Sequence, residues 1–149
     1  MKRPKHLKKC NNFPNVTKNN HLITSNEDVN YNCIAFAAGH IDRKMWPTFH
    51  PDYVWPPCVP TALTVSSFVA LYESYGYHRC ENGDYESSKE KICLWAIKDG
   101  TPTHAALQVG ANKWSSKLGD SFDIEHKQDA IAGGLYGLVE IYMERAKNR

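Results

Sequence analysis

Apolar residues first form regular blocks about 30 positions into the chain, and the first two blocks have helical character. Residues 33–39, CIAFAAG, combine Ala, Ile and Phe with a closing Gly39, which predicts a short helix because Gly readily adopts the left-handed C-cap conformation. Residues 60–76 begin at a Pro-Thr pair, end at a Gly and predict a second helix, with apolar residues near helical spacing at Leu63, Phe68, Leu71 and Tyr72.

Beyond residue 90 the pattern changes to the alternation that is typical of strands. Residues 90–100 are apolar in both alternating sets, which predicts a central strand buried on both faces. Residues 103–109 and 113–118 flank a Gly-containing turn and predict a hairpin. Residues 126–134 are expected to form a short helix or turn, and residues 134–146 predict a last strand with Val139, Ile141 and Met143 on one face.

The order of these elements predicts an α+β fold in which N-terminal helices pack on an antiparallel β-sheet meander. Residues 1–28 are basic and polar and are expected to form an irregular extension, whereas residues 29–149 are expected to form a single domain. Between the two predicted helices, residues 45–61 contain five prolines and five aromatic or histidine side chains. This composition excludes regular structure and predicts a long aromatic-proline loop.

Composition and charge exclude several classes of function. The net charge of +2 is too small to predict specific nucleic-acid binding. No apolar run is long enough for a signal peptide or a bilayer span, so we expect no membrane partner, and a cytoplasmic protein or one exported without a cleavable signal peptide. The five cysteines include no CxxC pair, which favours reduced thiols over disulfides or zinc.

Cys33 is the first candidate for chemistry because it begins the predicted helix of residues 33–39. Unpaired backbone N–H groups at a helix N-terminus favour an anion, and thiolates there are activated nucleophiles. The alternative is a buried cysteine that fills a gap in the core. A thiol nucleophile needs an imidazole base, and His104 at the start of the predicted hairpin, next to Ala105 and Ala106, is the histidine best suited to a cleft.

A third residue is expected to orient His104 from the next strand, where residues 113–119, KWSSKLG, contain no His, Asn, Asp or Glu. The register of the hairpin decides which side chain can do so: a three-residue turn places Trp114 and Ser116 on the His104 face, whereas a two-residue turn places Ser115 and Lys117 there. We favour Ser116, with alternatives in the following loop at Asp123 and His126.

The order of Cys on a helix and His on a hairpin strand resembles the papain-like superfamily, in particular the small NlpC-type cysteine peptidases and amidases. The resemblance rests on NCIAFAAG and THAALQVG. It implies Cys33 as nucleophile and His104 as general base, and the missing orienting residue is a departure from that pattern. The larger set NYNCIAFAAG, GTPTHAALQ, KWSSKLG, DIEH and YGLVEIYM resembles an uncharacterised bacterial domain family over nearly the whole chain, which implies no activity.

The remaining site residues follow from this arrangement. Asn32 is expected to donate to an oxyanion beside the Cys33 amide, and Tyr31 offers a hydroxyl for the same purpose. Substrate contacts are expected from Tyr31, Trp46, Trp114 and His126, although large aromatic residues also fill cores. No cofactor is expected. A metal site of Cys33, His104 and His126 lacks a supporting motif, as does nucleotide binding.

Together these features predict a Cys-His dependent hydrolase or acyl-transfer enzyme that acts on an amide bond through a thioester. Its substrate would be a peptide, peptidoglycan or a protein, and the sequence does not choose among peptidase, amidase and deamidase. The alternative is a catalytically inactive papain-like fold that serves as a protein-binding or inhibitor module through the aromatic-proline loop.

Overall fold

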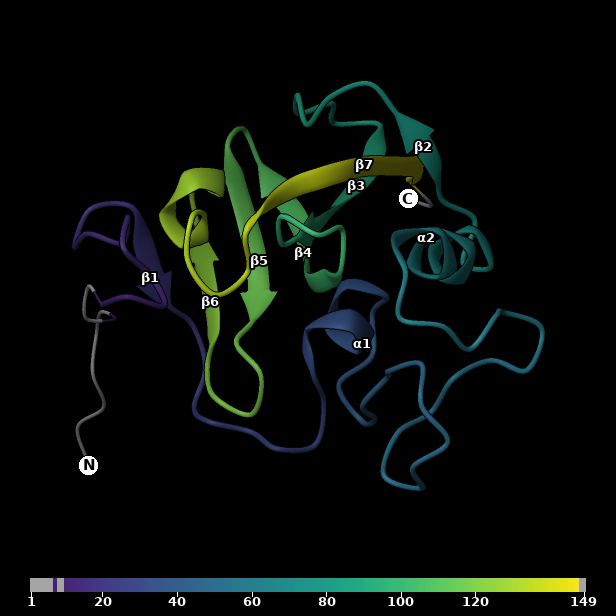
Figure 1. Cartoon of the computed structure of the whole chain (residues 1–149). Helices are drawn as coiled ribbons and strands as arrows, with labels where there is room; N and C mark the ends of the chain where they lie inside the picture. The colour runs from purple at the N-terminus through teal and green to yellow at the C-terminus, as the bar shows by residue number, and fades with distance from the viewer. Residues whose placement is uncertain (1–6, 8–9, 148–149) are drawn as a thin grey trace.

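The chain is built around one antiparallel sheet of seven strands, in the order β1-β6-β5-β4-β3-β7-β2 (Figure 1). The computed structural model describes residue 7 and residues 10–147. The strands are β1 His21–Ile23, β2 His78–Cys80, β3 Lys89–Ala96, β4 Pro102–Gly110, β5 Lys113–Lys117, β6 Asp123–His126 and β7 Leu138–Ala146. The helices are α1 Cys33–Ala37, α2 Val65–Glu73 and the 3-10 turn η1 Gln128–Ile131.

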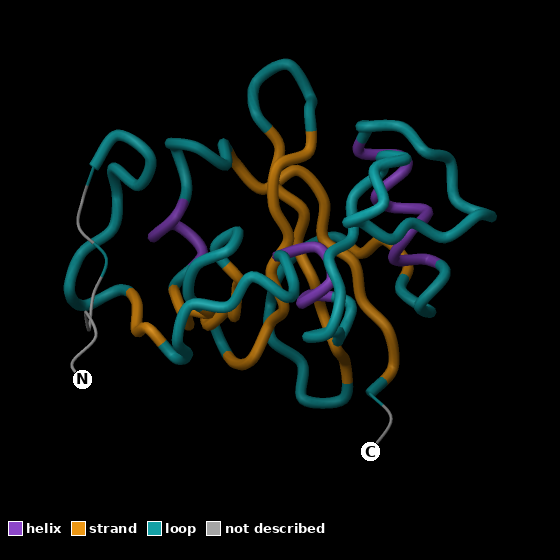
Figure 2. The backbone as a smooth tube through the Cα atoms, turned by 90° about the horizontal axis from the view of Figure 1, so that it is seen from below, coloured by secondary structure: helices purple, strands orange, loops and turns teal. Residues whose placement is uncertain are grey.

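This architecture shows that the expected papain-like α+β arrangement is wrong. The two α-helices span only 5 and 9 residues, and the sheet dominates the described part of the chain. Prolines keep most of residues 45–61 irregular, and the second helix begins at Val65 because Thr64 caps it, accepting a hydrogen bond from the Ser67 amide. The tube view in Figure 2 shows the long loops on both sides of the strands.

The predicted central strand and hairpin are confirmed. Residues 91–96 of β3 are buried without interruption, between β4 on one side and β7 on the other. Strand β4 pairs with β5 across the predicted turn. The short strands β1, β2 and β6 were not predicted, because three or four residues are too few to show a period.

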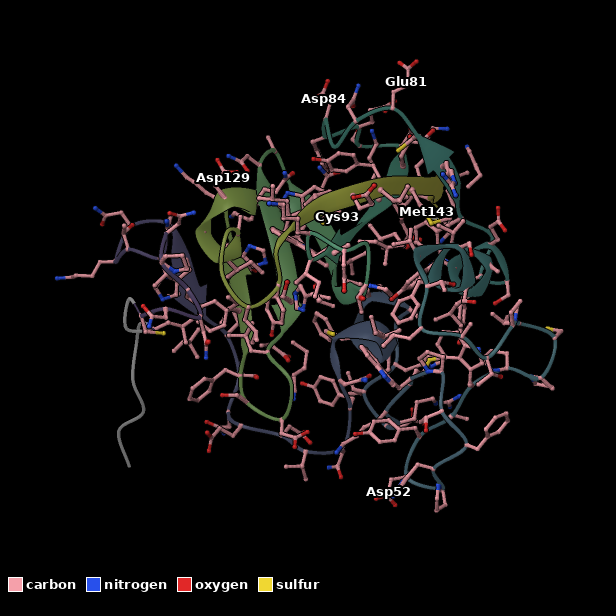
Figure 3. All side chains as sticks on the ribbon, viewed as in Figure 1. Asp52, Glu81, Asp84, Cys93, Asp129 and Met143 are labelled. Atoms are coloured by element: carbon pink, nitrogen blue, oxygen red, sulfur yellow. The ribbon has the colours of Figure 1, made fainter. Side chains whose placement is uncertain are left out.

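Alternation along the central strands sorts apolar side chains into two cores. The helix-side core contains α1, α2 and the sheet residues Ile92, Leu94, Ala105 and Met143. The far-side core lies on the opposite face and contains Cys93, Trp95, Ala106, Trp114 and Ile124. Cys93 and Met143 are labelled on the sheet in Figure 3. Both faces of β3 and β4 are therefore covered, and consecutive residues of these strands enter different cores.

Much of the expected irregular extension is part of this fold. Strand β1 pairs antiparallel with β6, and Val16 is 1% exposed. The Asn15 amide donates to the Ala132 carbonyl at 3.0 Å, which ties the segment to the loop before β7. The basic residues 1–6 and 8–9 lie outside the described residues. None of the helices in residue 7 and residues 10–147 is long and apolar enough to cross a membrane.

Gly137, in the loop before β7, lies in close contact with the backbone at Ala96. Its φ is +77°, and an added Cβ would lie 2.2 Å from the Ala96 carbonyl oxygen. We predict that Gly137→Ala lowers the free energy of unfolding by more than about 2 kcal/mol, because the left-handed conformation alone costs an L-residue about 1–2 kcal/mol and the clash adds to it.

Urea denaturation measures this loss, and Gly100→Ala is the matched control. Gly100 has a φ of +91° and nothing within 4 Å of an added Cβ, so it reports the conformational cost alone. Equal losses in the two variants would show that the contact with Ala96 does not constrain Gly137.

Candidate active site

Cys33 begins α1 and forms part of the wall of a pocket on the helix side of the sheet. The pocket has a volume of about 330 Å³. We call it the Cys33 pocket, and its lining residues are Asn32, Cys33, Lys44, Trp46, Tyr53, Thr103, Gly119, Asp120 and Tyr136. Cys33 itself is only 6% exposed. The thiol is placed at a helix start as expected, but almost entirely within the protein.

Burial controls the protonation of this thiol. Desolvation raises the pKa of Cys33 to about 11, because the thiolate loses contact with water. Hydrogen bonding by the Ala105 and Ile34 backbones and the charge of Lys117 lower this pKa, but their combined effect is smaller than that of burial. Cys33 is therefore a neutral thiol at neutral pH, whereas a cysteine nucleophile needs a depressed pKa.

His104 lies on the other face of the sheet from Cys33. It pairs in register with Trp95 of the far-side core, while the next residue, Ala105, belongs to the helix-side core together with Cys33. The His104 ring stacks on Tyr136, with centroids 4.1 Å apart and planes at 13°. The expected Cys33–His104 pair is therefore not formed, because strand alternation directs the imidazole away from α1.

Within the described residues, neither ring nitrogen of His104 has a hydrogen-bond partner, and the side chain is fully buried. Burial, with a further contribution from His126, lowers the pKa of His104 well below its usual range. A neutral imidazole without partners holds no thiolate and orients no substrate. The general-base role expected of His104 has no geometric support.

Ser116 and His126 do share the far face with His104. The Ser116 hydroxyl donates to His126 Nε2 at 2.7 Å, since the other ring nitrogen, Nδ1, donates to the Lys127 carbonyl at 2.8 Å. Burial lowers the pKa of His126 to about 4. Ser116 is 0% exposed, so this group is a buried polar connection between β5 and β6 and lacks the Cys33 thiol.

The hairpin register explains why Ser116 faces the far side. Gly110 pairs with Lys113 around a two-residue turn, which by itself would direct Ser115 and Lys117 to the His104 face. The register shifts between Gln108 and Gly110, however, and Gln108 pairs with Trp114. This bulge restores the arrangement expected of a three-residue turn.

The side chains of the two residues before Cys33 make hydrogen bonds that connect the start of α1 to other segments. The Asn32 side chain accepts hydrogen bonds from the Ala35 and Met45 amides and donates to the Met45 carbonyl at 2.8 Å. Tyr31 donates to the Asp123 carboxylate at 2.8 Å. The Asn32 oxygen and one of its two side-chain N–H hydrogens are thus engaged, which orients the amide toward α1 and Met45.

The expected tryptophan contacts divide between the two faces. Trp46 lines the Cys33 pocket and packs edge-on against Phe68. Trp114 is 1% exposed and belongs to the far-side core. Only Trp46 is therefore placed to contact a ligand beside Cys33.

Lys117 is the residue near Cys33 that sequence reasoning missed. Its ammonium group is buried, donates to the Asp28 and Gly119 carbonyls and lies 4.7 Å above the Tyr31 ring. Burial lowers its pKa, and Cys33 is among the groups that act on it electrostatically. Strand alternation could have identified Lys117 from the sequence, because placing Ser116 on the His104 face places the next residue, Lys117, on the Cys33 face.

A metal centre finds no support in residue 7 and residues 10–147. Across these residues no group of three or more His, Cys, Asp or Glu side chains is arranged to hold a metal ion. Cys33 lies on the opposite face from His104 and His126, which separates the three ligands considered from the sequence.

The fold and site together define an antiparallel β-sheet domain with a thiol-lined pocket on one face. Residues 22–144 match the family described as "Domain of unknown function (DUF7689)", and because this match covers most of the chain, the chain belongs to that family. Neither a curated protein nor a solved structure matches the chain.

The buried histidines predict a loss of stability in acid. An unfolded histidine binds a proton near pH 6.5, whereas folded His126 does so only near pH 4, so the unfolded state takes up more protons between these values. The free energy of unfolding should therefore fall as the pH drops from 6.5 to 4, by about 3 kcal/mol from His126 alone. His104 adds a loss of the same sign.

Urea denaturation at a series of pH values measures this dependence. His104→Phe retains an aromatic ring against Tyr136 but removes one titrating group, so its stability should fall less steeply than that of the wild type. An identical slope in the two proteins would contradict the depressed pKa of His104.

The thiol pKa predicts a slow reaction at Cys33. With iodoacetamide at pH 8, Cys33 should be alkylated more slowly than the exposed residues Cys10 and Cys58, since Cys33 is buried and burial raises its pKa to about 11. Peptide mapping by mass spectrometry follows each site, and labelling in urea provides the fully accessible control. Preferential alkylation of Cys33 in the folded protein would show an activated thiol.

Proposed function

We propose that this domain is a binding module that receives an apolar side chain of a protein partner in the Cys33 pocket. The observation that carries the proposal is the position of the aromatic-proline loop, residues 45–61. This loop supplies Trp46 and Tyr53 to the pocket wall and also holds Phe49, which is 92% exposed. A highly exposed phenylalanine in a loop that also lines an aromatic pocket is typical of a protein-interaction surface.

The size and lining of the pocket favour a single large side chain. Its volume of about 330 Å³ is at the lower end of the range for small-molecule sites. Trp46, Tyr53 and Tyr136 offer aromatic surface to an apolar group. Thr103 is already engaged, because its hydroxyl donates to the Tyr136 carbonyl at 2.6 Å. An apolar side chain at this wall therefore does not leave the Thr103 hydroxyl unpaired.

A charged pair in the pocket lining can contact the backbone of the partner next to the bound side chain. Lys44 and Asp120 form an ion pair at 3.3 Å, and the Asp120 side chain is 63% exposed. Both residues line the pocket. The pair can exchange its exposed, weakly stabilising contact for hydrogen bonds to a partner backbone.

Exposed apolar residues on both sides of the loop extend this surface. Four large apolar side chains between residues 41 and 63 are at least 45% exposed, namely Ile41, Phe49, Val54 and Leu63. These residues connect the two helices on the helix side of the sheet. They supply the additional apolar area that a side chain in a small pocket needs for stable binding.

In this geometry the hydrolase interpretation loses His104, the base that it expects. A thioester mechanism requires the nucleophile and base to approach hydrogen-bond distance, and His104 enters the far-side core. The Cys33 thiol therefore contributes to the pocket as a small, soft, neutral surface. In this role the thiol forms no acyl-enzyme.

Peptide display tests the binding module. Selection of random peptides on the immobilised full chain should enrich sequences that share a large apolar residue, and Phe49→Ser should weaken their binding at least tenfold, or about 1.4 kcal/mol. Leu22→Ser is the matched control, because Leu22 is 53% exposed on the edge strand β1 and is not part of the pocket lining.

Two results would contradict the proposal. Selected peptides that bind Phe49→Ser and the wild type equally would exclude the aromatic-proline loop as the contact surface. Hydrolysis of a peptide or peptidoglycan amide that disappears in Cys33→Ala would instead establish the thiol chemistry expected from the sequence.

A further inference from the structure

A second pocket lies on the far side of the sheet and is larger than the Cys33 pocket. Its volume is about 470 Å³. We call it the Gly83 pocket, and it is lined by Asn82, Gly83, Asp84, Tyr85, Ala111, Asn112, Trp114, Gln128 and Tyr142. In Figure 3, Asp84 of this pocket and Asp129, which follows the lining residue Gln128, lie at the opposite end of the molecule from Asp52 of the aromatic-proline loop. A ligand here is independent of the proposed partner site.

Gly83 gives this pocket a fixed form. An added Cβ at Gly83 would lie 2.6 Å from Tyr142 Cε1 and 3.0 Å from Trp114 Cζ2, so the backbone lies directly against the two rings. The side chain of Gln108 donates to the Gly83 carbonyl at 2.6 Å and so fixes the position of the Gly83 backbone. The pocket is thus formed before any ligand arrives, which reduces the entropic cost of binding.

Aromatic rings supply its apolar surface. The Trp114 and Tyr142 rings lie with centroids 6.3 Å apart at an angle of 38°, and Tyr85 is 42% exposed at the edge. The ring of Trp114 is almost wholly covered, so Tyr85 and the half-buried Tyr142 present the accessible faces. Such faces carry partial negative charge and attract groups with weakly positive hydrogens.

Three primary amides supply the polar surface, and each is oriented by a hydrogen bond to its own oxygen. The Asn82 oxygen accepts from the Asp84 amide at 3.0 Å, and the Asn112 oxygen accepts from the Gln128 amide at 3.1 Å. The Gln128 oxygen accepts from the Tyr142 hydroxyl at 2.8 Å. The NH₂ groups make no hydrogen bonds within the described part of the chain, so three oriented donors remain for a ligand.

Charge narrows the class of ligand. Asp84 is the only charged side chain in the lining, so an anionic ligand such as a phosphate ester finds no cation and one repelling carboxylate. A purely apolar ligand would cover the three NH₂ groups without bonding them, which is costly. A cation would be attracted by Asp84 but would offer no acceptors to the three NH₂ groups. The ligand that fits best is therefore uncharged, has one apolar face and carries several oxygen atoms around its edge.

We infer that the Gly83 pocket binds a neutral saccharide ring. The C–H groups on one face of a pyranose would pack on Tyr142 and Tyr85, since these hydrogens match the negative faces of the rings. The ring hydroxyls would accept hydrogen bonds from the NH₂ groups of Asn82, Asn112 and Gln128 and donate to the Asp84 carboxylate. Binding alone is inferred, because one carboxylate does not make a glycoside hydrolase pair.

NMR on the full-length protein tests this inference. The side-chain NH₂ signals of Asn82, Asn112 and Gln128 are followed in ¹H–¹⁵N spectra while cellotetraose, maltotetraose, xylotetraose or tetra-N-acetylchitotetraose is added. At least one saccharide should shift these signals saturably. Adenosine, which is neutral and stacks on aromatic rings but lacks a pyranose, should not shift them.

Variants then assign the effect to the pocket. Asp84→Ala and Gln128→Ala should each weaken saccharide binding at least tenfold, since each removes hydrogen bonds that the ligand makes. Asp52→Ala is the matched control on the opposite side of the molecule and should leave binding unchanged. Gly83→Ala should abolish binding by displacing Tyr142, with the backbone amide spectrum showing whether the fold is intact.

Three outcomes would overturn the inference. No shift of the NH₂ signals with any of the four saccharides would exclude the ligand class. A saturable shift with adenosine would indicate a site for planar bases. Saccharide binding that is unchanged in both Asp84→Ala and Gln128→Ala would place the saccharide elsewhere on the protein.

Discussion

The alternation of side chains along β4 is the constraint on which the rest of the structure depends. Both faces of this strand are covered, so Ala105 faces α1 and the helix-side core, while His104 and Ala106 face the far-side core. The same alternation in β5 directs Lys117 toward Cys33, and Ser116 toward His126. One strand pair thus separates two sets of polar residues that appear as a single constellation in the sequence.

Burial then determines what each set can do. On the helix side, a neutral thiol, an engaged asparagine and a buried lysine surround a small aromatic pocket. On the far side, His104 and His126 are kept neutral by desolvation. Among residue 7 and residues 10–147, neither face brings an activated nucleophile together with an adjacent imidazole, and the proposed binding function rests on this geometry. The Gly83 pocket, which is larger than the Cys33 pocket, lies beside the far-side core and has no thiol in its lining.

The sequence predicts the parts of this fold that have a strong period. The β4–β5 hairpin and the last strand were predictable from the alternation of their residues and the Gly-containing turn, and β3 from its continuous apolar run. The far-face position of Ser116 was also predictable once the register was considered, although a bulge and not a longer turn produces it. Strands of three or four residues, such as β1 and β6, gave no period, and α1 with 5 residues was too short to define a helical layer.

The candidate site was harder to predict, for a physical reason. Alternation fixes which residues of a strand share a face, but it does not say on which face a distant helix packs. The position of α1 is set by tertiary contacts, including Asn32 with Met45 and Tyr31 with Asp123. Residues of the Gly83 pocket come from two loops, the 3-10 turn η1 and two strands that are far apart in the sequence, so no local motif predicts them.

The most direct test of this account is an NMR titration of the His104 imidazole in the wild type and in Cys33→Ala. His104 makes no hydrogen bond to Cys33, so it should stay neutral as the pH falls through 6.5 in both proteins. A thiolate–imidazolium pair would instead raise the titration midpoint of His104 above 6.5 in the wild type and lower it on removal of Cys33. That result would place Cys33 and His104 in one site and contradict the separation described above.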